Sequence, residues 1–275
     1  MFSIEIVRSP ERARPIRAAL FDFDGTLSLV REGWQNVMIP YFCEVIAAAP
    51  GAKDESSEHI ETITREFVDK ITGKQTIYQC IRLAEEVQAR GGAPLDPLDY
   101  KNEYLRRLQR RIQSRIDELE QGADPDRFVV PGGRRFLSLL RDAGIKLYLA
   151  SGTDERFVKQ EASLLQLTDY FDGGVYGAQD DYKTFSKALV ISRLIESNSL
   201  VGAELVGFGD GYVEIENVKA VGGYAVGVAT NEANPGGGID DWKRRRLLDA
   251  GADAIAPDFS ESDRLFAFVV NGQTN

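Results

Sequence analysis

The fold class can be inferred from one stretch of the sequence, Leu20-Phe21-Asp22-Phe23-Asp24-Gly25-Thr26-Leu27. It includes the end of a largely apolar run from Ala18 to Phe23, which is typical of a buried strand, and Gly25 lets the chain turn just after it. Ligands of open α/β sheets bind beyond the carboxyl ends of the strands, so Asp22 and Asp24 are expected to point into one crevice. Close carboxylates repel each other unless a cation lies between them or one of them takes up a proton. The simpler alternative is a solvated Asp-Gly turn at the end of a strand.

Length and composition indicate a globular protein with a substantial core. The chain has 275 residues, enough for one large domain or two smaller ones, and its 43% hydrophobic and 28% charged residues do not indicate disorder. A formal charge of −10 argues against general binding to nucleic acid or to anionic membranes, which favour a basic face. We therefore expect neither as a partner, and a monomer or homodimer that binds a small metabolite.

The expected compartment and the kinds of site that the chain can form are restricted further by its cysteines, its N-terminus and its single histidine. Cys43 and Cys80 lie in apolar or helical stretches, so we expect buried, inert thiols and a reducing compartment. The N-terminus lacks the pattern of a signal peptide and no apolar segment reaches membrane-spanning length, so the expected location is cytoplasmic. His59 is the only histidine, which excludes sites built on several imidazoles, and its neighbours predict an exposed helix surface.

Strands alternate with helices in most of the chain, which predicts an α/β fold with a doubly wound parallel sheet. The expected strands are 2–7, 18–23, 145–150, a short one around Val175, 204–209, 224–229 and one near Ala254. The expected helices are 133–143, one from Asp154, 187–196, one from Glu214 and 242–249.

An all-helical insert interrupts this pattern. Residues 29–127 contain few β-branched runs, and apolar residues recur there at helical spacing, as in Tyr104, Leu105, Leu108, Ile112, Ile116 and Leu119. The α/β core would then comprise residues 1–28 and 128–275. The helix carries five arginines, Arg106, Arg107, Arg110, Arg111 and Arg115, which we interpret as its solvated side in preference to a partner-binding face.

Three further strand ends and helix starts carry polar side chains that suit a phosphate or metal site. Ser151-Gly152-Thr153 follows an expected strand and precedes a helix, where hydroxyl and backbone N–H groups can hold a phosphate oxygen or simply cap the helix. Asp210 follows another strand, with Glu214 four residues later in the first turn of a helix. Lys187 opens an apolar helix, where its ammonium group can neutralise a phosphoryl group.

In this order, these residues resemble the four motifs of the haloacid dehalogenase superfamily. The motifs are Asp22-Phe23-Asp24-Gly25-Thr26, Ser151-Gly152-Thr153, Lys187, and Gly209-Asp210-Gly211 with Glu214. The resemblance covers the whole core and implies a Rossmann-like sheet. The helical insert after the first motif is similar to the family's cap domain.

The resemblance implies a phosphoric monoester hydrolase that works through an aspartyl-phosphate intermediate. Asp22 would be the nucleophile, and Asp24 would protonate the leaving oxygen and later deprotonate the attacking water. Ser151, Gly152 and Lys187 would hold the phosphoryl oxygens. The acid at position 24 argues against the dehalogenase and P-type ATPase branches, which lack it.

The resemblance also implies Mg²⁺ as cofactor. Its ligands would be the Asp22 carboxylate, the Asp24 backbone carbonyl and Asp210, with Glu214 bound directly or through water. Lys183, four residues before Lys187, is an alternative phosphate-binding lysine, although the position of Lys187 at the head of its helix fits the phosphatase branches better.

Substrate choice is expected to come from the cap. The break Thr72-Gly73-Lys74-Gln75-Thr76 lies between two helical stretches, so Lys74 and Gln75 are candidate specificity residues, although an ordinary interhelical turn fits equally well. Arg31, Trp34 and Gln35 are further candidates for the entrance. The expected substrate is a small phosphomonoester, either a sugar phosphate or a phosphoglycolate-like acid.

Three other functions compete with the phosphatase. A sugar phosphomutase of the β-phosphoglucomutase type would use the same residues. A nucleotide-binding oxidoreductase fails because Tyr212 stands where the third glycine after Gly207 and Gly209 would be needed, far from the first strand. A catalytically silent binding protein is disfavoured because every charged motif position is present.

Overall fold

The chain folds into two compact units. The computed structural model describes residues 4–9, 14–179, 182 and 185–272. One unit, the core unit, comprises Met1–Glu32 and Glu118–Asn275, and the other, the helical unit, comprises Gly33–Asp117. The helical unit begins later and ends earlier than the insert expected from composition. At its C-terminal end this is because one continuous helix, α4 (Pro97–Glu120), crosses the boundary between the units.

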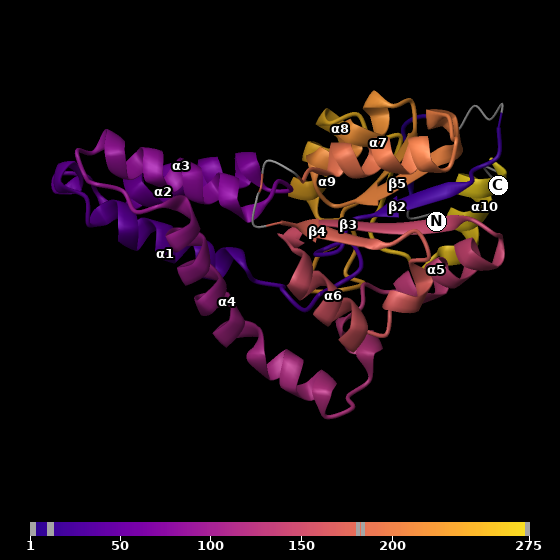
Figure 1. Ribbon diagram of the computed structural model, residues 1–275, viewed down its shortest axis with the longest axis horizontal. Coiled ribbons are helices and arrows are strands. Elements are labelled where there is room, and N and C mark those ends of the chain that lie inside the picture. Colours follow the sequence, from indigo (N-terminus) through magenta and orange to yellow (C-terminus); the bar gives the residue numbers. More distant parts are fainter. Residues whose placement is uncertain (1–3, 10–13, 180–181, 183–184, 273–275) are drawn as a thin grey trace. The chain divides into compact units, whose positions relative to one another are not determined.

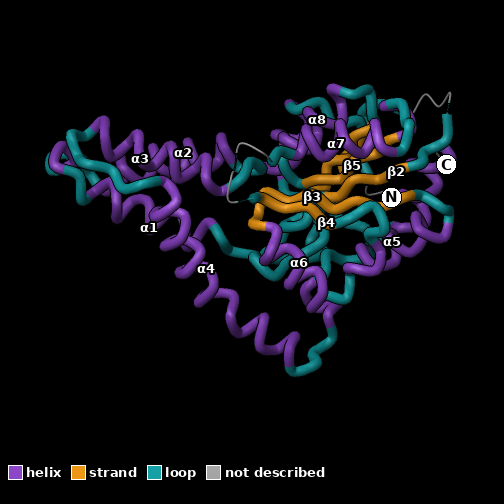
Figure 2. The backbone as a smooth tube through the Cα atoms, viewed as in Figure 1, coloured by secondary structure: helices purple, strands orange, loops and turns teal. Residues whose placement is uncertain are grey.

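A seven-stranded sheet forms the centre of the core unit in the described part of the chain (Figures 1 and 2). Its order is β1-β7-β6-β5-β2-β3-β4, and every pairing is parallel except that of β1 with β7 at the edge. The doubly wound parallel sheet is thereby confirmed, with one antiparallel edge strand. The strands are β1 (Glu5–Ile6), β2 (Ala18–Phe21), β3 (Lys146–Asp154), β4 (Val175–Ala178), β5 (Leu205–Gly209), β6 (Tyr224–Val228) and β7 (Ala254–Ala256).

Helices cover both faces of this sheet (Figure 1). On one face lie α7 (Lys187–Ser197), α8 (Tyr212–Ala220) and α9 (Asp241–Asp249). On the other lie α5 (Gly133–Asp142), α6 (Glu155–Leu164) and α10 (Ser262–Asn271), of which α10 was not expected from the sequence. Short 3₁₀ segments occur at Pro50–Ala52, Pro125–Phe128, Thr168–Tyr170 and Gly202–Glu204.

Strand β2 is buried on both sides, which explains why its sequence reads as an apolar run. Successive side chains of a strand point to opposite faces. Leu20 belongs to a core cluster with residues of α7, α8 and α9. Phe21 stacks on Phe208 of β5 with ring centroids 4.6 Å apart and meets Phe136 of α5 edge-on at 6.3 Å. The cluster around Leu20 on one face and the aromatic contacts of Phe21 on the other hold β2 in the middle of the sheet.

Two strands that lead into motif residues end at different residues from those expected. β2 stops at Phe21 instead of Phe23, because the Phe23 carbonyl accepts hydrogen bonds from the backbone N–H groups of Thr26, Leu27 and Ser28 and so belongs to a turn. β3 continues through Ser151-Gly152-Thr153 to Asp154, with an irregular register against β4 after Ala150. The polar residues of the second motif therefore lie in the last part of β3, past a break in its ladder.

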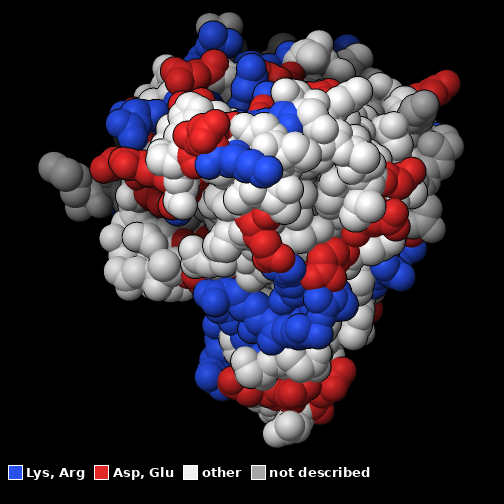
Figure 3. Space-filling model, turned by 90° about the vertical axis from the view of Figure 1, so that its left-hand side faces the viewer, with Lys and Arg blue, Asp and Glu red and all other residues white. Residues whose placement is uncertain are grey.

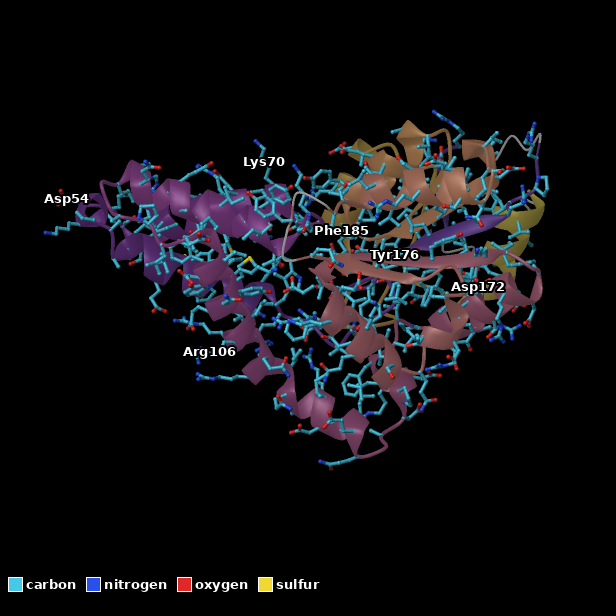
Figure 4. All side chains as sticks on the ribbon, in the orientation of Figure 1. Asp54, Lys70, Arg106, Asp172, Tyr176 and Phe185 are labelled. Carbon is cyan, nitrogen blue, oxygen red and sulfur yellow. The ribbon has the colours of Figure 1, made fainter. Side chains whose placement is uncertain are left out.

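The helical unit contains α1 (Gln35–Ala47), α2 (Ser57–Ile71), α3 (Thr76–Ala89) and most of α4, and all of its residues are described (Figure 2). The six apolar positions predicted for α4 are buried, so its amphipathic pattern is confirmed. Figure 3 shows Lys and Arg side chains as a band over α4, and Arg106 points outwards in Figure 4. Glu103 pairs with Arg106 and Arg107 within the helix, as expected for a solvated charged face.

The remaining composition-based expectations have mixed outcomes. His59 is confirmed as a surface residue, with its side chain 58% exposed. Cys80 is buried as expected, but the prediction of a buried Cys43 was wrong, because this residue lies only partly covered on α1. Across the described ranges, we find no helix that combines the length and the apolar character needed to cross a bilayer.

Candidate active site

The turn after β2 places Asp22 and Asp24 at the carboxyl edge of the sheet. β2 lies between β5 and β3, so this turn occupies the middle of the edge. The backbone N–H of Asp22 donates to the Phe208 carbonyl (2.9 Å), and that of Phe23 donates to Asp22 Oδ1 (2.8 Å). Gly25 takes a φ of 74°, a left-handed conformation that glycine adopts without strain. The sequence-based placement of both carboxylates at one strand end thus agrees with the turn.

Asp22 is a buried carboxylate held by a lysine. The residue is 6% exposed, and Lys187 Nζ lies 2.9 Å from its Oδ1. Burial raises the pKa of Asp22 to about 6, with Lys187 opposing the rise and the nearby carboxylates of Asp210 and Asp24 adding to it. At neutral pH the carboxylate is therefore ionised, the form that a nucleophile requires.

Lys187 is positioned by the start of α7. Ser186 is the N-cap of this helix, and its hydroxyl accepts a hydrogen bond from the Leu189 N–H (3.1 Å). The Lys187 side chain is almost completely buried and contacts the carboxylates of both Asp22 and Glu214. The alternative lysine, Lys183, lies outside the described residues. The structure thus brings Lys187 to the side of Asp22.

The end of β3 holds the Asp24 carboxylate. The hydroxyl groups of Ser151 and Thr153 donate to Asp24 Oδ2 at 3.2 and 2.8 Å. Ser151 Oγ in turn accepts a hydrogen bond from the Thr153 N–H (3.0 Å), and Gly152 lies between the two. The structure therefore brings Ser151 to Asp24, and it adds Thr153, to which the sequence analysis gave no role of its own.

Arg31 lies on the other side of Asp24. Its Nε lies 3.8 Å from Asp24 Oδ1. Its guanidinium forms a bidentate ion pair with Glu161 of α6, in which Nε and Nη2 lie 3.0 and 2.6 Å from Glu161 Oε1. Both side chains are buried. Burial raises the pKa of Glu161, and Arg31 opposes the rise. Arg31, expected to be an entrance residue, is instead fixed inside the core unit beside Asp24.

Asp210 follows β5, the neighbour of β2. Its backbone N–H donates to Thr26 Oγ1 (3.0 Å), which ties it to the turn of the first motif. A Cβ on Gly25 would overlap Asp210 Oδ2, so only glycine allows this approach. Glu214 lies in the first turn of α8, is 2% exposed and contacts Lys187.

The structure adds a buried ion pair that the sequence analysis missed. Lys243 Nζ lies 2.7 Å from Asp210 Oδ2 and 2.6 Å from Glu232 Oε1. Burial alone would lower the pKa of Lys243, but the carboxylates of Asp210 and Glu232 together raise it. Burial raises the pKa of Glu232, which Lys243 opposes. The sequence gives only a weak indication of this ion pair, which is that Glu232 and Lys243 both follow β6, the strand beside β5.

The donors at this edge suit a hard cation such as Mg²⁺. They are carboxylate oxygens, and Asp24 Oδ1 and Glu214 Oε2 are buried without a hydrogen-bond partner. Within the described ranges, no three carboxylate, cysteine or histidine side chains are already gathered as a metal cage. Mg²⁺ needs only one or two carboxylates because it keeps several waters and binds substrate phosphate. Asp22, the Asp24 carbonyl and Asp210 fit this kind of open site.

The two specificity candidates of the helical unit lie in the turn between α2 and α3. Lys74 is exposed, and its backbone N–H donates to the Ile71 carbonyl (3.1 Å). Gln75 is buried, only 6% exposed. Of the other entrance candidates, Gln35 donates to Asp69 within the same unit (3.2 Å). An interhelical turn is confirmed, and a role in specificity stays a prediction.

Comparison with known proteins gives a family and a set of similar folds. A family model of the haloacid dehalogenase-like hydrolases matches residues 16–222. A predicted phosphoglycolate phosphatase from Haemophilus somnus has a similar structure, with 15% identity, a TM-score of 0.59 and coverage of 92% of this chain and 99% of that one. No curated protein sequence matches the chain significantly.

Two further solved structures share the fold. A β-phosphoglucomutase from Clostridium difficile has 14% identity and a TM-score of 0.59, covering 90% of this chain and 92% of that one. CbbY from Rhodobacter sphaeroides, solved in complex with phosphate, has 18% identity and a TM-score of 0.56, covering 90% and 96%. At these identities the likeness shows the fold alone.

Proposed function

Because the chain belongs to the haloacid dehalogenase-like hydrolases, we propose that it is a Mg²⁺-dependent phosphatase that hydrolyses a small phosphomonoester through an aspartyl-phosphate. The main support for this proposal is the environment of the Asp22 carboxylate. This buried, ionised carboxylate ends the central strand, has Lys187 Nζ at 2.9 Å, and is followed two residues later by a second carboxylate. A nucleophile, its cationic partner and an acid therefore meet at one strand end.

In the first half-reaction, an Asp22 carboxylate oxygen attacks phosphorus. The new bond joins Asp22 to the phosphoryl group, and the bond from phosphorus to the ester oxygen breaks. The leaving oxygen takes a proton from Asp24, which enters the reaction as the carboxylic acid. The hydroxyl groups of Ser151 and Thr153 orient Asp24 for this transfer.

In the second half-reaction, water attacks phosphorus. Asp24, now a carboxylate, accepts the proton of this water, and the bond from phosphorus to Asp22 breaks. Inorganic phosphate leaves and both carboxyl groups return to their starting forms. The ammonium group of Lys187, buried beside Asp22, balances the negative charge of the nucleophile and of the phosphoryl oxygens in both steps.

The proposed cation site uses the Asp22 carboxylate, the Asp24 backbone carbonyl and Asp210, with Glu214 as an additional support. When bound, Mg²⁺ would act as a Lewis acid that withdraws charge from the phosphoryl oxygens. Thr26 contributes by holding the Asp210 backbone beside the turn of the first motif.

We assign substrate choice to the helical unit, as the cap of this enzyme, with Lys74 and Gln75 as specificity residues. The substrate class is a sugar phosphate or a phosphoglycolate-like acid, because an exposed lysine suits a second anionic or hydroxyl-rich group. The name of the similar phosphoglycolate phosphatase agrees with this class. A Lys74→Ala variant is expected to raise KM for the preferred ester while leaving kcat nearly unchanged.

A sugar phosphomutase is the second candidate, favoured by the similar fold of a β-phosphoglucomutase. It would use the same residues but return the phosphoryl group to the sugar instead of to water. A mutase would require a bisphosphate activator and would release little phosphate.

Phosphate release from a panel of phosphomonoesters, with and without Mg²⁺, tests the proposal. The native protein is compared with Asp22→Asn. Release that needs Mg²⁺ and disappears in the variant supports the phosphatase. Isomerisation of a sugar phosphate in the presence of a bisphosphate, without net release, would support the mutase instead, and inactivity in both assays would favour a silent binding protein.

A further inference from the structure

The pair Lys243 and Glu232 has no role in the chemistry described above, although it lies at the same edge of the sheet. Lys243 is only 10% exposed and Glu232 18% exposed, so the pair is largely removed from water. Burying an ammonium group is costly unless carboxylates compensate for it. Its nearest carboxylate oxygens belong to Asp210 and Glu232, at 2.7 and 2.6 Å.

The local structure gives Lys243 no other reason to be buried here. It lies in the first turn of α9, where Asp240 is the N-cap and accepts hydrogen bonds from the N–H groups of Trp242 and Lys243 at 3.0 and 2.9 Å. The positive end of the helix dipole makes this an unfavourable position for a cation. The lysine is therefore stabilised by what its ammonium group contacts, not by the helix that carries it.

Both partners of the ammonium group face the turn of the first motif. A Cβ on Gly25 would overlap Asp210 Oδ2 and lie 2.9 Å from Glu232 Oε1. The two carboxylates that Lys243 contacts thus lie against the Gly25 turn, and the lysine occupies an oxygen of Asp210, a residue that we assign to Mg²⁺. Lys187 neutralises the Asp22 side of the same group of carboxylates.

We propose that Lys243 is an internal counter-ion that competes with the divalent cation for Asp210, and that Glu232 retains the lysine when Mg²⁺ takes its place. This inference rests on the proposed metal site. An ammonium group and Mg²⁺ both seek the negative charge of the same carboxylate, so each weakens the binding of the other. In the metal-free protein, Lys243 limits the mutual repulsion of the carboxylates and keeps Asp210 in place.

Mg²⁺ binding by isothermal titration calorimetry tests the competition directly. Lys243→Met removes the competing charge, so the Kd for Mg²⁺ should fall by about tenfold, the scale of one lost charge-assisted hydrogen bond. The melting temperature of this variant without metal should be lower than that of the native protein, and its increase on adding Mg²⁺ should be larger.

A charge-neutral double variant separates competition from net charge. Glu232→Gln with Lys243→Met removes one positive and one negative charge, and it leaves no unpaired Glu232, which favours folding. The Kd for Mg²⁺ should still fall. Lys219→Met is the matched control, because Lys219 pairs with Asp253 (2.8 Å) at the amino ends of β6 and β7, the opposite edge of the sheet, and its Mg²⁺ affinity should equal that of the native protein.

An unchanged or higher Kd in the double variant would overturn the proposal. A higher value would make Lys243 a residue that positions Asp210 for the metal, and an unchanged value after a fall in the single variant would reduce the effect to net charge. These measurements use Mg²⁺ alone and no substrate. A protein that hydrolyses no phosphomonoester can therefore still confirm or contradict the competition.

Discussion

Replacing Asp22 by Asn should change how the stability of the metal-free protein depends on pH. Burial raises the pKa of Asp22 from its ordinary value of 3.8 to about 6, despite the opposing charge of Lys187. Between these values the folded protein holds a proton that the unfolded chain has lost. Stability therefore falls as pH rises through this window. The whole effect amounts to about 3 kcal/mol, of which about 2 kcal/mol lies between about pH 4.5 and pH 8.

Urea denaturation of both proteins in the presence of a chelator measures this effect. The Asn side chain does not titrate, so the difference in unfolding free energy should shift in favour of Asp22→Asn by about 2 kcal/mol over that range. Asp54→Asn, which replaces an exposed carboxylate of the helical unit, is a suitable comparison (Figure 4). Stability curves of the native protein and Asp22→Asn that stay parallel with pH would show that burial does not raise the pKa of Asp22.

Three further predictions concern the site and its support. Glu161→Ala leaves the buried Arg31 guanidinium without its bidentate partner, so the free energy of unfolding should fall by about 3 kcal/mol or more in urea denaturation, and a loss below about 1 kcal/mol would contradict the burial of this pair. Phe136→Ala opens a cavity beneath the central strand and should cost about 3 to 5 kcal/mol by the same measurement, whereas a small loss would mean that the aromatic layer is loosely packed. Asp24→Asn removes the proton donor and should lower kcat for phosphate release by about 10² to 10⁴ while circular dichroism stays native, and a kcat within a few-fold of native would remove Asp24 from the mechanism.

The residues that follow local rules were predictable from the sequence. β2 is buried on both faces, so its residues form an apolar run before Asp22, and this run predicts a central strand. Parallel strands end at one edge, so the same rule places Asp24 and Asp210 at one side of the sheet. Lys187 was predictable as the first residue of an apolar helix, and α7 begins there.

The parts that depend on tertiary packing were not predictable. The pairs of Arg31 with Glu161 and of Lys243 with Glu232 join elements that no local pattern connects. Thr153 reaches Asp24 only because β3 continues past the break in its ladder. Sequence spacing indicates which residues lie near the strand ends, but it does not show which side chains neutralise one another once the loops beyond them have folded.

In the proposed mechanism, Asp22 carries the phosphoryl group during turnover. The most direct test quenches the enzyme during steady-state hydrolysis of its preferred ester in Mg²⁺, reduces it with borohydride, and maps the peptides by mass spectrometry. Reduction of an acyl phosphate converts its aspartate to homoserine. Homoserine is expected at position 22, and only when ester is present. Active enzyme with an unmodified Asp22, or with homoserine at another aspartate, would contradict this mechanism.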